Sequence, residues 1–286
     1  MKPVQIGLLG IGTVGGGTFE VLLRNQAEIE RRAGRKIEIT TVADTNTERA
    51  TQLVKGRAKV VSDAGLILAD PSIDIVIELI GGYGIARDLV LKAIDAGKHV
   101  VTANKALIAV HGTEIFSAAQ KKGVTVAFEA AVAGGIPIIK ALREGLSANR
   151  IEWIAGIING TTNYILSEMR SRGLTFAQAL SEAQALGYAE ADPTFDVEGV
   201  DAGHKATILS AIAYGIPVQF NKAHVEGISK LDTQDIAYAE QLGYRIRLLG
   251  MVRRTKHGIE LRVHPCLIPS KRLIANVEGA MNAVMV

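Results

Sequence analysis

The first half of the chain alternates short apolar segments with longer segments whose apolar residues recur at helical spacing. The short segments are rich in valine and isoleucine and are apolar on both faces, which is typical of buried parallel strands. The expected strands are residues 4–10, 37–44, 73–79, 99–104 and 124–130. The helical segments between them, such as 86–98 and 113–123, end in glycine or lysine. This alternation predicts an α/β domain with a doubly wound parallel sheet.

The first turn of this domain is rich in glycine. It reads Gly10-Ile11-Gly12-Thr13-Val14-Gly15, a G-x-G-x-x-G pattern that follows the first strand and opens a helix expected to run from about Gly15 to Ala33. In that context the glycines allow a tight turn and a close backbone approach to a pyrophosphate, as in a Rossmann-type dinucleotide site. No Gly-Lys-Ser/Thr follows, which excludes a nucleoside-triphosphate P-loop. A turn without a ligand remains the alternative.

Asp44 closes the second expected strand. An acidic residue at this point hydrogen-bonds the ribose hydroxyls of a dinucleotide and repels a 2′-phosphate, which favours NAD over NADP. The adjacent Ala43 supplies no cation for that phosphate. The alternative is that Asp44 only begins the turn and helix cap of the "DTNTE" segment.

Two further strand ends carry candidate ligand-binding residues, because ligands of such sheets bind beyond the carboxyl ends of the strands. Gly81 and Gly82 follow the third expected strand, and Asn104 and Lys105 follow the fourth. We expect Lys105 to contact cofactor or substrate, the alternative being a surface lysine.

The pattern changes from about Ile136. A strand is expected within "IEWIAGIING", helices within "TTNYILSEMRS" and "TFAQALSEAQALG", and a pair of strands around the "KHG" turn. This order does not repeat the strand–helix–strand pattern of the first half and is typical of an α+β domain. We therefore divide the chain into a dinucleotide-binding domain at residues 1–135 and a substrate-binding and dimerisation domain at 136–286.

The second domain contains an acidic stretch, "GYAEADPTFDVEGVDAGHK", from Gly187 to Lys205. If a helix begins near Gly199, Asp201 and Lys205 lie on one stripe with Ile208, Leu209 and Ile212, whereas His204, Thr207 and Ser210 lie elsewhere. The acid and the lysine then begin the buried face. A lysine held in a partly dry cleft beside carboxylates can carry a proton, and further acids suit a substrate with an ammonium group. Asp192 precedes a proline and can instead only shape the turn.

Composition excludes several classes of protein. The net charge of +3 over 286 residues is spread without a long basic run, so neither nucleic acid nor a membrane surface is an expected partner. Cys266 is the single cysteine, which excludes an internal disulfide and fits a reducing compartment. No signal pattern opens the chain and no apolar run reaches membrane-spanning length. We expect a cytoplasmic protein.

Several motifs together resemble the homoserine dehydrogenase family. The segment "AQALGYAEADPTFDVEGVDAGHK" fits the signature of that family in full, and "GIGTVG", "ELIGG", "TANKAL", "FEAAVAGGIPII" and "GIINGTTNYIL" extend the resemblance over nearly the whole chain. The resemblance implies reversible NAD(P)-dependent interconversion of L-homoserine and L-aspartate 4-semialdehyde, in threonine, methionine and isoleucine biosynthesis. It also implies a homodimer or higher homo-oligomer.

The resemblance also assigns roles to individual residues. Lys205 is implied as the proton donor and acceptor, with Lys105 and Asp201 as further catalytic residues. The implied substrate-binding residues are Glu190, Asp196, Asp201 and Thr161. The implied cofactor-binding residues are Gly10, Gly12, Thr13, Val14, Gly15, Asp44, Lys105 and Gly187. A sodium-type cation is implied at Glu129, Val132, Gly134 and Ile136, largely through backbone carbonyls, a chemistry that hard cations accept.

Two departures from the family pattern bear on function. Many bacterial relatives have an arginine beside the Asp44 position, where this chain has Ala43. The chain ends at Val286, whereas relatives continue into a return segment and often a regulatory domain, so we expect a truncated form with weak cofactor binding. The alternative functions are a non-catalytic dinucleotide sensor or another amino-acid dehydrogenase of the same fold.

Overall fold

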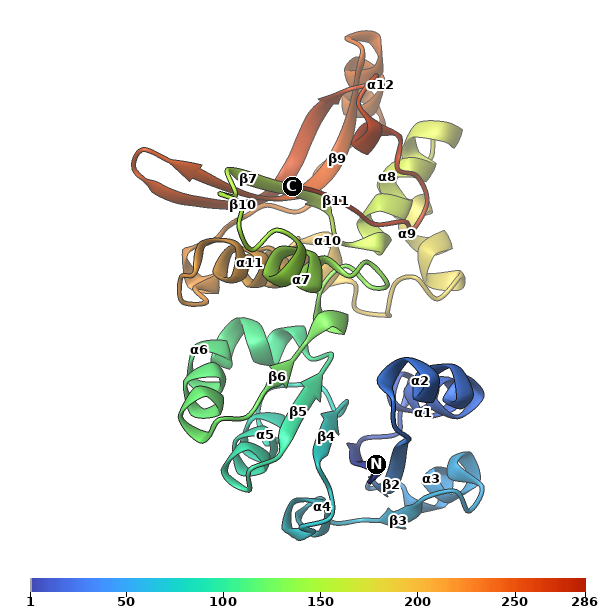
Figure 1. The fold of residues 1–286 in the computed structure, drawn as a ribbon. Helices are drawn as coiled ribbons and strands as arrows, with labels where there is room; N and C mark the ends of the chain where they lie inside the picture. Colours follow the sequence, from blue (N-terminus) through green and yellow to red (C-terminus); the bar gives the residue numbers. More distant parts are fainter. Residues whose placement is uncertain (1) are drawn as a thin grey trace. The chain divides into compact units, whose positions relative to one another are not determined.

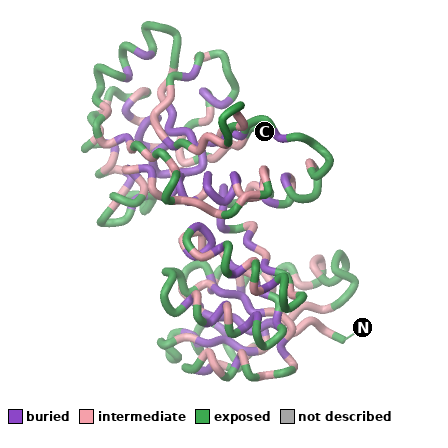
Figure 2. The backbone as a smooth tube through the Cα atoms, turned by 90° about the vertical axis from the view of Figure 1, so that its left-hand side faces the viewer, coloured by how far each residue is buried: buried purple, intermediate pink, exposed green. Residues whose placement is uncertain are grey.

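The chain folds into two compact units, one ending at Ala131 and the other running from Val132 to Val286. The computed structural model describes residues 2–286 (Figure 1). In each unit the buried stretches run through the interior, and the exposed segments lie outside them (Figure 2). The observed division falls four residues before the boundary expected from the sequence, which lies after Gly135.

The first unit contains a six-stranded parallel sheet in the order β3-β2-β1-β4-β5-β6. Its strands are β1 (Val4–Leu9), β2 (Ile37–Ala43), β3 (Lys59–Val61), β4 (Ile75–Glu78), β5 (His99–Thr102) and β6 (Val126–Ala127). The strand order reverses between β1 and β4, which is where a doubly wound sheet opens a crevice for ligands. The expected α/β doubly wound fold is confirmed. The sequence analysis missed β3, a strand of only three residues.

The helices of the first unit connect successive strands. They are α1 (Thr13–Arg24), α2 (Gln26–Ala33), α3 (Thr47–Val54), α4 (Gly65–Ala69), α5 (Ile85–Asp95), α6 (Lys105–Lys122) and the 3-10 turn η1 (Glu129–Ala131). The expectation of one helix from Gly15 to Ala33 was wrong. Asn25 has φ −102° and ψ 15°, outside helical geometry, and it ends α1 and begins α2.

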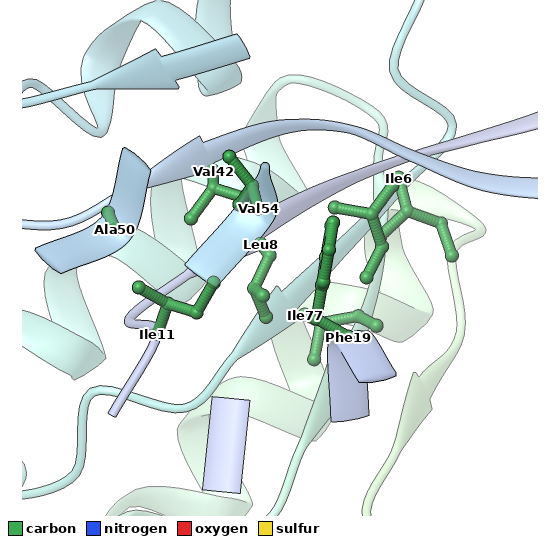
Figure 3. Close-up of a cluster of buried hydrophobic side chains, with 9 residues drawn as sticks. Ile6, Leu8, Ile11, Phe19, Val42, Ala50, Val54 and Ile77 are labelled. Atoms are coloured by element: carbon green, nitrogen blue, oxygen red, sulfur yellow. The ribbon is translucent and has the colours of Figure 1, made fainter. Parts of the chain in front are cut away.

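The core of the first unit fixes the glycine-rich turn. Ile6 and Leu8 of β1 pack with Phe19 of α1 and Val54 of α3 (Figure 3). Ile11, inside the glycine-rich turn, belongs to the same cluster and is 1% exposed. Burial of such a side chain contributes about 1.5–3 kcal/mol. The turn is therefore anchored to the core by the side chain between its first two glycines.

The second unit contains a five-stranded sheet in the order β11-β7-β9-β10-β8, antiparallel except for the β8–β10 pair. Its strands are β7 (Trp153–Ile157), β8 (His224–Val225), β9 (Tyr244–Thr255), β10 (Gly258–Pro269) and β11 (Ala283–Met285). Its helical elements are α7 (Ile138–Lys140), η2 (Ala141–Gly145), α8 (Gly160–Arg172), α9 (Phe176–Ala185), α10 (Thr194–Val197), α11 (Val200–Tyr214), η3 (Phe220–Lys222), α12 (Thr233–Gln241) and η4 (Leu273–Asn276). The expected α+β material is confirmed, including the β9–β10 hairpin.

Helix α11 is buried on nearly every side, which corrects the expected single buried stripe. His204, Thr207 and Ser210 are 4%, 1% and 2% exposed, although they lie off that stripe. The helix packs against β9 and β10, and a side chain at Gly203 would place its Cβ 2.8 Å from the Phe220 ring. Burial on several sides at once hides the 3.6-residue periodicity on which the stripe depends.

Across residues 2–286, no helix combines the length and apolar character needed to cross a membrane.

Candidate functional site

The three glycines of the first turn have different surroundings. Gly10 has φ +86°, and a Cβ there would lie 2.9 Å from the carbonyl oxygen of Leu79. A Cβ on Gly15 would lie 2.1 Å from the carbonyl oxygen of Gly10, so only glycine lets α1 start so close to the turn. A Cβ on Gly12 would meet nothing within 4 Å. The space beside Gly12 is therefore open to a ligand such as a pyrophosphate.

The N-terminus of α1 can accept an anion. Gly12 is its N-cap and provides no side-chain hydrogen bond, and the first turn contains no acidic residue. Thr13 and Val14 begin the helix and are exposed. Unclaimed backbone N–H groups and the positive end of the helix dipole favour a phosphate here. These residues fit the phosphates of a dinucleotide.

Asp44 connects the end of β2 to the glycine-rich turn. Its Oδ2 accepts a hydrogen bond from Ile11 N at 2.8 Å, and its Oδ1 accepts one from Asn46 N at 2.8 Å. The N-cap of α3 is Asn46. Asp44 is therefore not the cap itself, although it does shape the turn before it. Each carboxylate oxygen retains a second lone pair, with which it can accept from a ribose hydroxyl.

Lys105 is the first residue of α6, beyond the carboxyl end of β5, and it is half-buried. Asn104 is the N-cap of this helix, with its Oδ1 accepting from Leu107 N at 3.0 Å. The polar start of α6 thus lies on the sheet edge where ligands of this fold bind.

Asp201 and Lys205 form an ion pair within α11 of the second unit. Lys205 Nζ lies 2.7 Å from Asp201 Oδ2 and donates a second hydrogen bond to Ile158 O at 2.8 Å. The side chain of Asp201 is 1% exposed and that of Lys205 is 15% exposed. The expected i,i+4 pair is present. The ammonium is held by two acceptors, and the Lys205 side chain keeps a small exposed fraction.

Asn159 bridges two carboxylates in the second unit. Its Nδ2 donates to Asp196 Oδ1 at 2.6 Å and to Asp201 Oδ2 at 2.9 Å. Its Oδ1 accepts from Thr162 N at 2.8 Å, so Asn159 is also the N-cap of α8. Asn159 is 5% exposed. The sequence analysis did not select this residue, since the 37 and 42 residues that separate it from its partners carry no local signal.

The acidic stretch from Gly187 to Lys205 includes a helix end, a loop, the short helix α10 and the start of α11. Gly187 (φ +76°) terminates α9, where its N–H bonds Gln184 O and the N–H of Tyr188 bonds Ala183 O, the pattern of a Schellman motif. Thr161 Oγ1 donates to Tyr188 O at 2.6 Å and ties this loop to α8.

The acids of the stretch differ in burial. Glu190 and Asp192 are exposed, Asp196 is half-buried and Asp201 is buried. Asp192 Oδ1 accepts from Thr194 N at 3.1 Å, and hydrogen bonds from Thr194 lower the pKa of this carboxyl. Asp192 therefore shapes the turn before α10. The stretch runs from a solvated loop into the wall of the site.

The expected cation ligands fall in both units. Glu129 lies in η1 of the first unit, and Val132, Gly134 and Ile136 lie at the start of the second. Residues 2–286 contain no group of three or more His, Cys, Asp or Glu side chains arranged for a metal ion. The expected cation site uses only one carboxylate, so it stays a prediction.

Cys266 lies in β10, where burial raises the pKa of its thiol to about 11. Its thiolate is therefore scarce at neutral pH, and a covalent thiol mechanism has no suitable nucleophile here.

Comparison with known proteins shows the family of both units. A family model described as the NAD binding domain of homoserine dehydrogenase matches residues 10–129, and one described as homoserine dehydrogenase matches residues 137–286. The homoserine dehydrogenase of Pseudomonas aeruginosa is 66% identical over 286 residues, which are 100% of this chain and 65% of that protein. The chain therefore spans less than two thirds of the length of this relative.

Solved structures give the same result. A homoserine dehydrogenase from Thiobacillus denitrificans has a TM-score of 0.96 and 66% identity, covering 99% of this chain and 65% of that one. A hyperthermophilic archaeal homoserine dehydrogenase in complex with NADPH has a TM-score of 0.81 and 27% identity, covering 99% of this chain and 87% of that one. The chain belongs to the homoserine dehydrogenase family.

Proposed function

We propose that the protein interconverts L-homoserine and L-aspartate 4-semialdehyde with NAD(H) or NADP(H), and so serves threonine, methionine and isoleucine biosynthesis. The observation that carries the proposal is the Asp201–Lys205 ion pair, a nearly dry ammonium inside the segment that matches the homoserine dehydrogenase family. A dinucleotide supplies the hydride when it is bound. This chain's residues hold the substrate, manage the proton and stabilise charge on the reacting oxygen.

Lys205 is the proton carrier in this proposal. Two of its N–H donors are used by Asp201 Oδ2 and Ile158 O, which fixes the direction of the third. When the aldehyde is reduced, negative charge develops on its oxygen, and an ammonium at that oxygen stabilises and protonates it. In the reverse direction the neutral amine accepts the proton of the hydroxyl group.

Asp201 acts mainly on Lys205 rather than on the amino acid. Its carboxylate is almost inaccessible to solvent and is bonded by Lys205 and Asn159. The exposed Glu190 and the half-buried Asp196 are better placed to bind the ammonium group of homoserine. Thr161 contributes through the loop that carries Glu190, because its hydroxyl holds the carbonyl of Tyr188.

The first unit provides the cofactor site. Gly12, Thr13 and Val14 offer the phosphate cradle, and Asp44 offers acceptors for the ribose hydroxyls. Asp44 favours NAD, and the NADPH complex of the archaeal relative keeps NADP as the alternative. Lys105 and Gly187 are proposed to contribute at the reacting end of the cofactor.

The cation site at Glu129, Val132, Gly134 and Ile136, a homodimer and a cytoplasmic location complete the proposal. A dimer is supported by large apolar side chains exposed on the second unit: Leu267 at 58%, Leu273 at 88% and Met281 at 67%. The single cysteine fits a reducing compartment.

The test is an assay of NADH and NADPH oxidation with L-aspartate 4-semialdehyde, with other aldehydes as controls. We expect turnover that is specific for the amino-acid aldehyde. Dinucleotide binding without turnover would indicate a sensor instead, and turnover of a different aldehyde would indicate another dehydrogenase of this fold.

A further inference from the structure

Glu78 is a carboxylic acid placed in the interior of the first unit. It is the last residue of β4 and is 0% exposed. In the sheet it lies opposite Leu9 of β1 on one side and opposite Thr102 of β5 on the other. An acid in the middle of a parallel sheet is costly unless donors surround it.

Three donors satisfy this carboxylate. Its Oε1 accepts from Ile80 N at 2.9 Å and Gly81 N at 3.1 Å, and its Oε2 accepts from Thr102 Oγ1 at 2.6 Å. Hydrogen bonds to a charged acceptor are stronger than those between neutral groups. Two of the donors are backbone N–H groups of the loop that follows β4, so the buried Glu78 side chain fixes the backbone of this loop.

The network continues into the loop after β5. Thr102 Oγ1 accepts from Asn104 N at 2.9 Å, and Asn104 Nδ2 donates to Gly82 O at 2.5 Å. Glu78, Thr102 and Asn104 therefore close a ring of hydrogen bonds between the two loops. Because Asn104 is the N-cap of α6, this ring also sets where Lys105 begins that helix.

The glycine-rich turn packs against the peptide group between Leu79 and Ile80. A Cβ on Gly10 would lie 2.9 Å from Leu79 O and 3.1 Å from Ile80 N, the very N–H group that Glu78 binds. Leu79 N also donates to Leu9 O at 2.9 Å. One buried carboxylate thus supports the loops at the carboxyl ends of β1, β4 and β5.

The loop after β4 is anchored at Leu79, which packs against the hydrophobic core, whereas residues 80–84 are exposed. Ile80 and Tyr83 are 43% and 52% exposed. Gly81 and Gly82 have φ of +86° and +68°. Glycine restricts its own backbone dihedral angles less than any other residue does. Beyond Leu79, the backbone of this loop is held by the hydrogen bonds that Ile80 N and Gly81 N donate to Glu78 and by the one that Gly82 O accepts from Asn104.

We propose that Glu78 is a positioning residue for the dinucleotide. It fixes the backbone of residues 79–82 and the start of α6 in the arrangement that binds the cofactor. The proposal rests on the proposed function only in requiring a dinucleotide at this edge of the sheet. Because the Glu78 side chain is fully buried, it acts through the backbone groups that it binds.

Two sets of variants test this role. Glu78→Gln keeps the size of the side chain but cannot accept from Thr102 while also accepting from both amides of the loop. Thr102→Val removes the hydroxyl that links Glu78 to Asn104, and Thr102→Ser retains it. The dissociation constants of NADH and NADPH are measured by fluorescence titration, together with thermal melting and the KM values for dinucleotide and aspartate semialdehyde.

We expect Glu78→Gln and Thr102→Val to weaken dinucleotide binding about tenfold, the scale of one lost charge-assisted hydrogen bond. Thr102→Ser should restore wild-type affinity, and the KM for the aldehyde should change by less than about twofold. A lower melting temperature with unchanged dinucleotide affinity in both Glu78→Gln and Thr102→Val would overturn the positioning role. If the wild-type protein binds dinucleotide but does not turn over the aldehyde, the proposed reaction fails, and a tenfold loss of dinucleotide affinity in the variants would still support the positioning role. If the wild-type protein binds no dinucleotide, both are overturned.

Discussion

In the first unit the groups suited to a ligand are mostly backbone N–H groups, whereas in the second unit they are side chains. The turn from Gly10 to Gly15 leaves no room for a side chain at Gly10 or Gly15, and its shape comes from the core that holds Ile11 and from Glu78. The cluster around Asp201 and Lys205 works because Asn159, from a different helix, holds the carboxylates in place. We therefore expect ligand binding in the first unit to be impaired by added side-chain atoms at the glycines. In the second unit we expect function to be impaired by the loss of a hydrogen-bonding partner.

The largest expected effect is on turnover in the second unit. Lys205→Met should lower turnover by about 100-fold or more, the usual scale for loss of a general acid–base group. It also leaves the buried carboxylate of Asp201 without its cation, which costs stability. Lys205→Arg keeps a cation beside Asp201 but cannot release its proton near neutral pH, so it should lose turnover equally.

Lys98→Met is the matched control for this prediction. Lys98 is also a buried lysine, with Nζ bonded to Asp70 O and Ile73 O. Its replacement should lower the melting temperature while turnover per folded molecule stays within about twofold of wild type. A similar loss of turnover in Lys98→Met would show that stability, not proton transfer, explains the effect at Lys205.

The next largest effect separates two glycines of the same turn. Gly15→Ala places a methyl group against Gly10 O and should destabilise the fold by about 1–3 kcal/mol, the usual cost of overpacking. Gly12→Ala has room for its methyl group, so stability should change by less than about 0.5 kcal/mol. Its methyl group occupies the phosphate cradle, however, and dinucleotide affinity should fall about tenfold or more. Denaturant unfolding and NADH titration measure the two effects.

Asn159→Ser tests the bridge between Asp196 and Asp201. A serine can still cap α8 but cannot donate to both carboxylates, so we expect turnover to fall about tenfold with a small loss of stability. Asp232→Ser, at the N-cap of α12 in the same unit, is the control and should leave turnover unchanged. The measurement is steady-state kinetics. If kcat and KM of Asn159→Ser equal the wild-type values, the role of Asn159 is only to cap α8.

The smallest effect concerns the choice of nucleotide. Asp44→Asn keeps an acceptor for Ile11 N but removes the charge that repels a 2′-phosphate, so the preference for NADH over NADPH should narrow by several-fold, roughly 1 kcal/mol. Asp44→Ala should narrow the preference as well, and it also removes the hydrogen bond between Asp44 and Ile11 N in the glycine-rich turn. The ratio of kcat/KM values for the two dinucleotides is the measurement. A wild-type protein that strongly prefers NADPH would contradict this role of Asp44.

The separation of interacting residues along the chain explains which features the sequence could predict. The glycine turn, the parallel strands and the i,i+4 spacing of Asp201 and Lys205 are local patterns, and the structure contains all of them. The Asn159 bridge and the Glu78–Thr102 pair join residues 24 to 42 positions apart and depend on which elements pack together. Burial of α11 on several sides weakened its periodicity, and the break at Asn25 has no glycine or proline to mark it.

In the proposed function the two units contribute separate steps: the first binds the dinucleotide and the second transfers the proton. The most direct test is the NADH dissociation constant of Lys205→Arg, measured beside that of Gly12→Ala and wild type. We predict that Lys205→Arg binds NADH within about twofold of wild type despite its loss of turnover, whereas Gly12→Ala binds about tenfold more weakly. Weakening of NADH binding in Lys205→Arg to the level of Gly12→Ala would contradict the account.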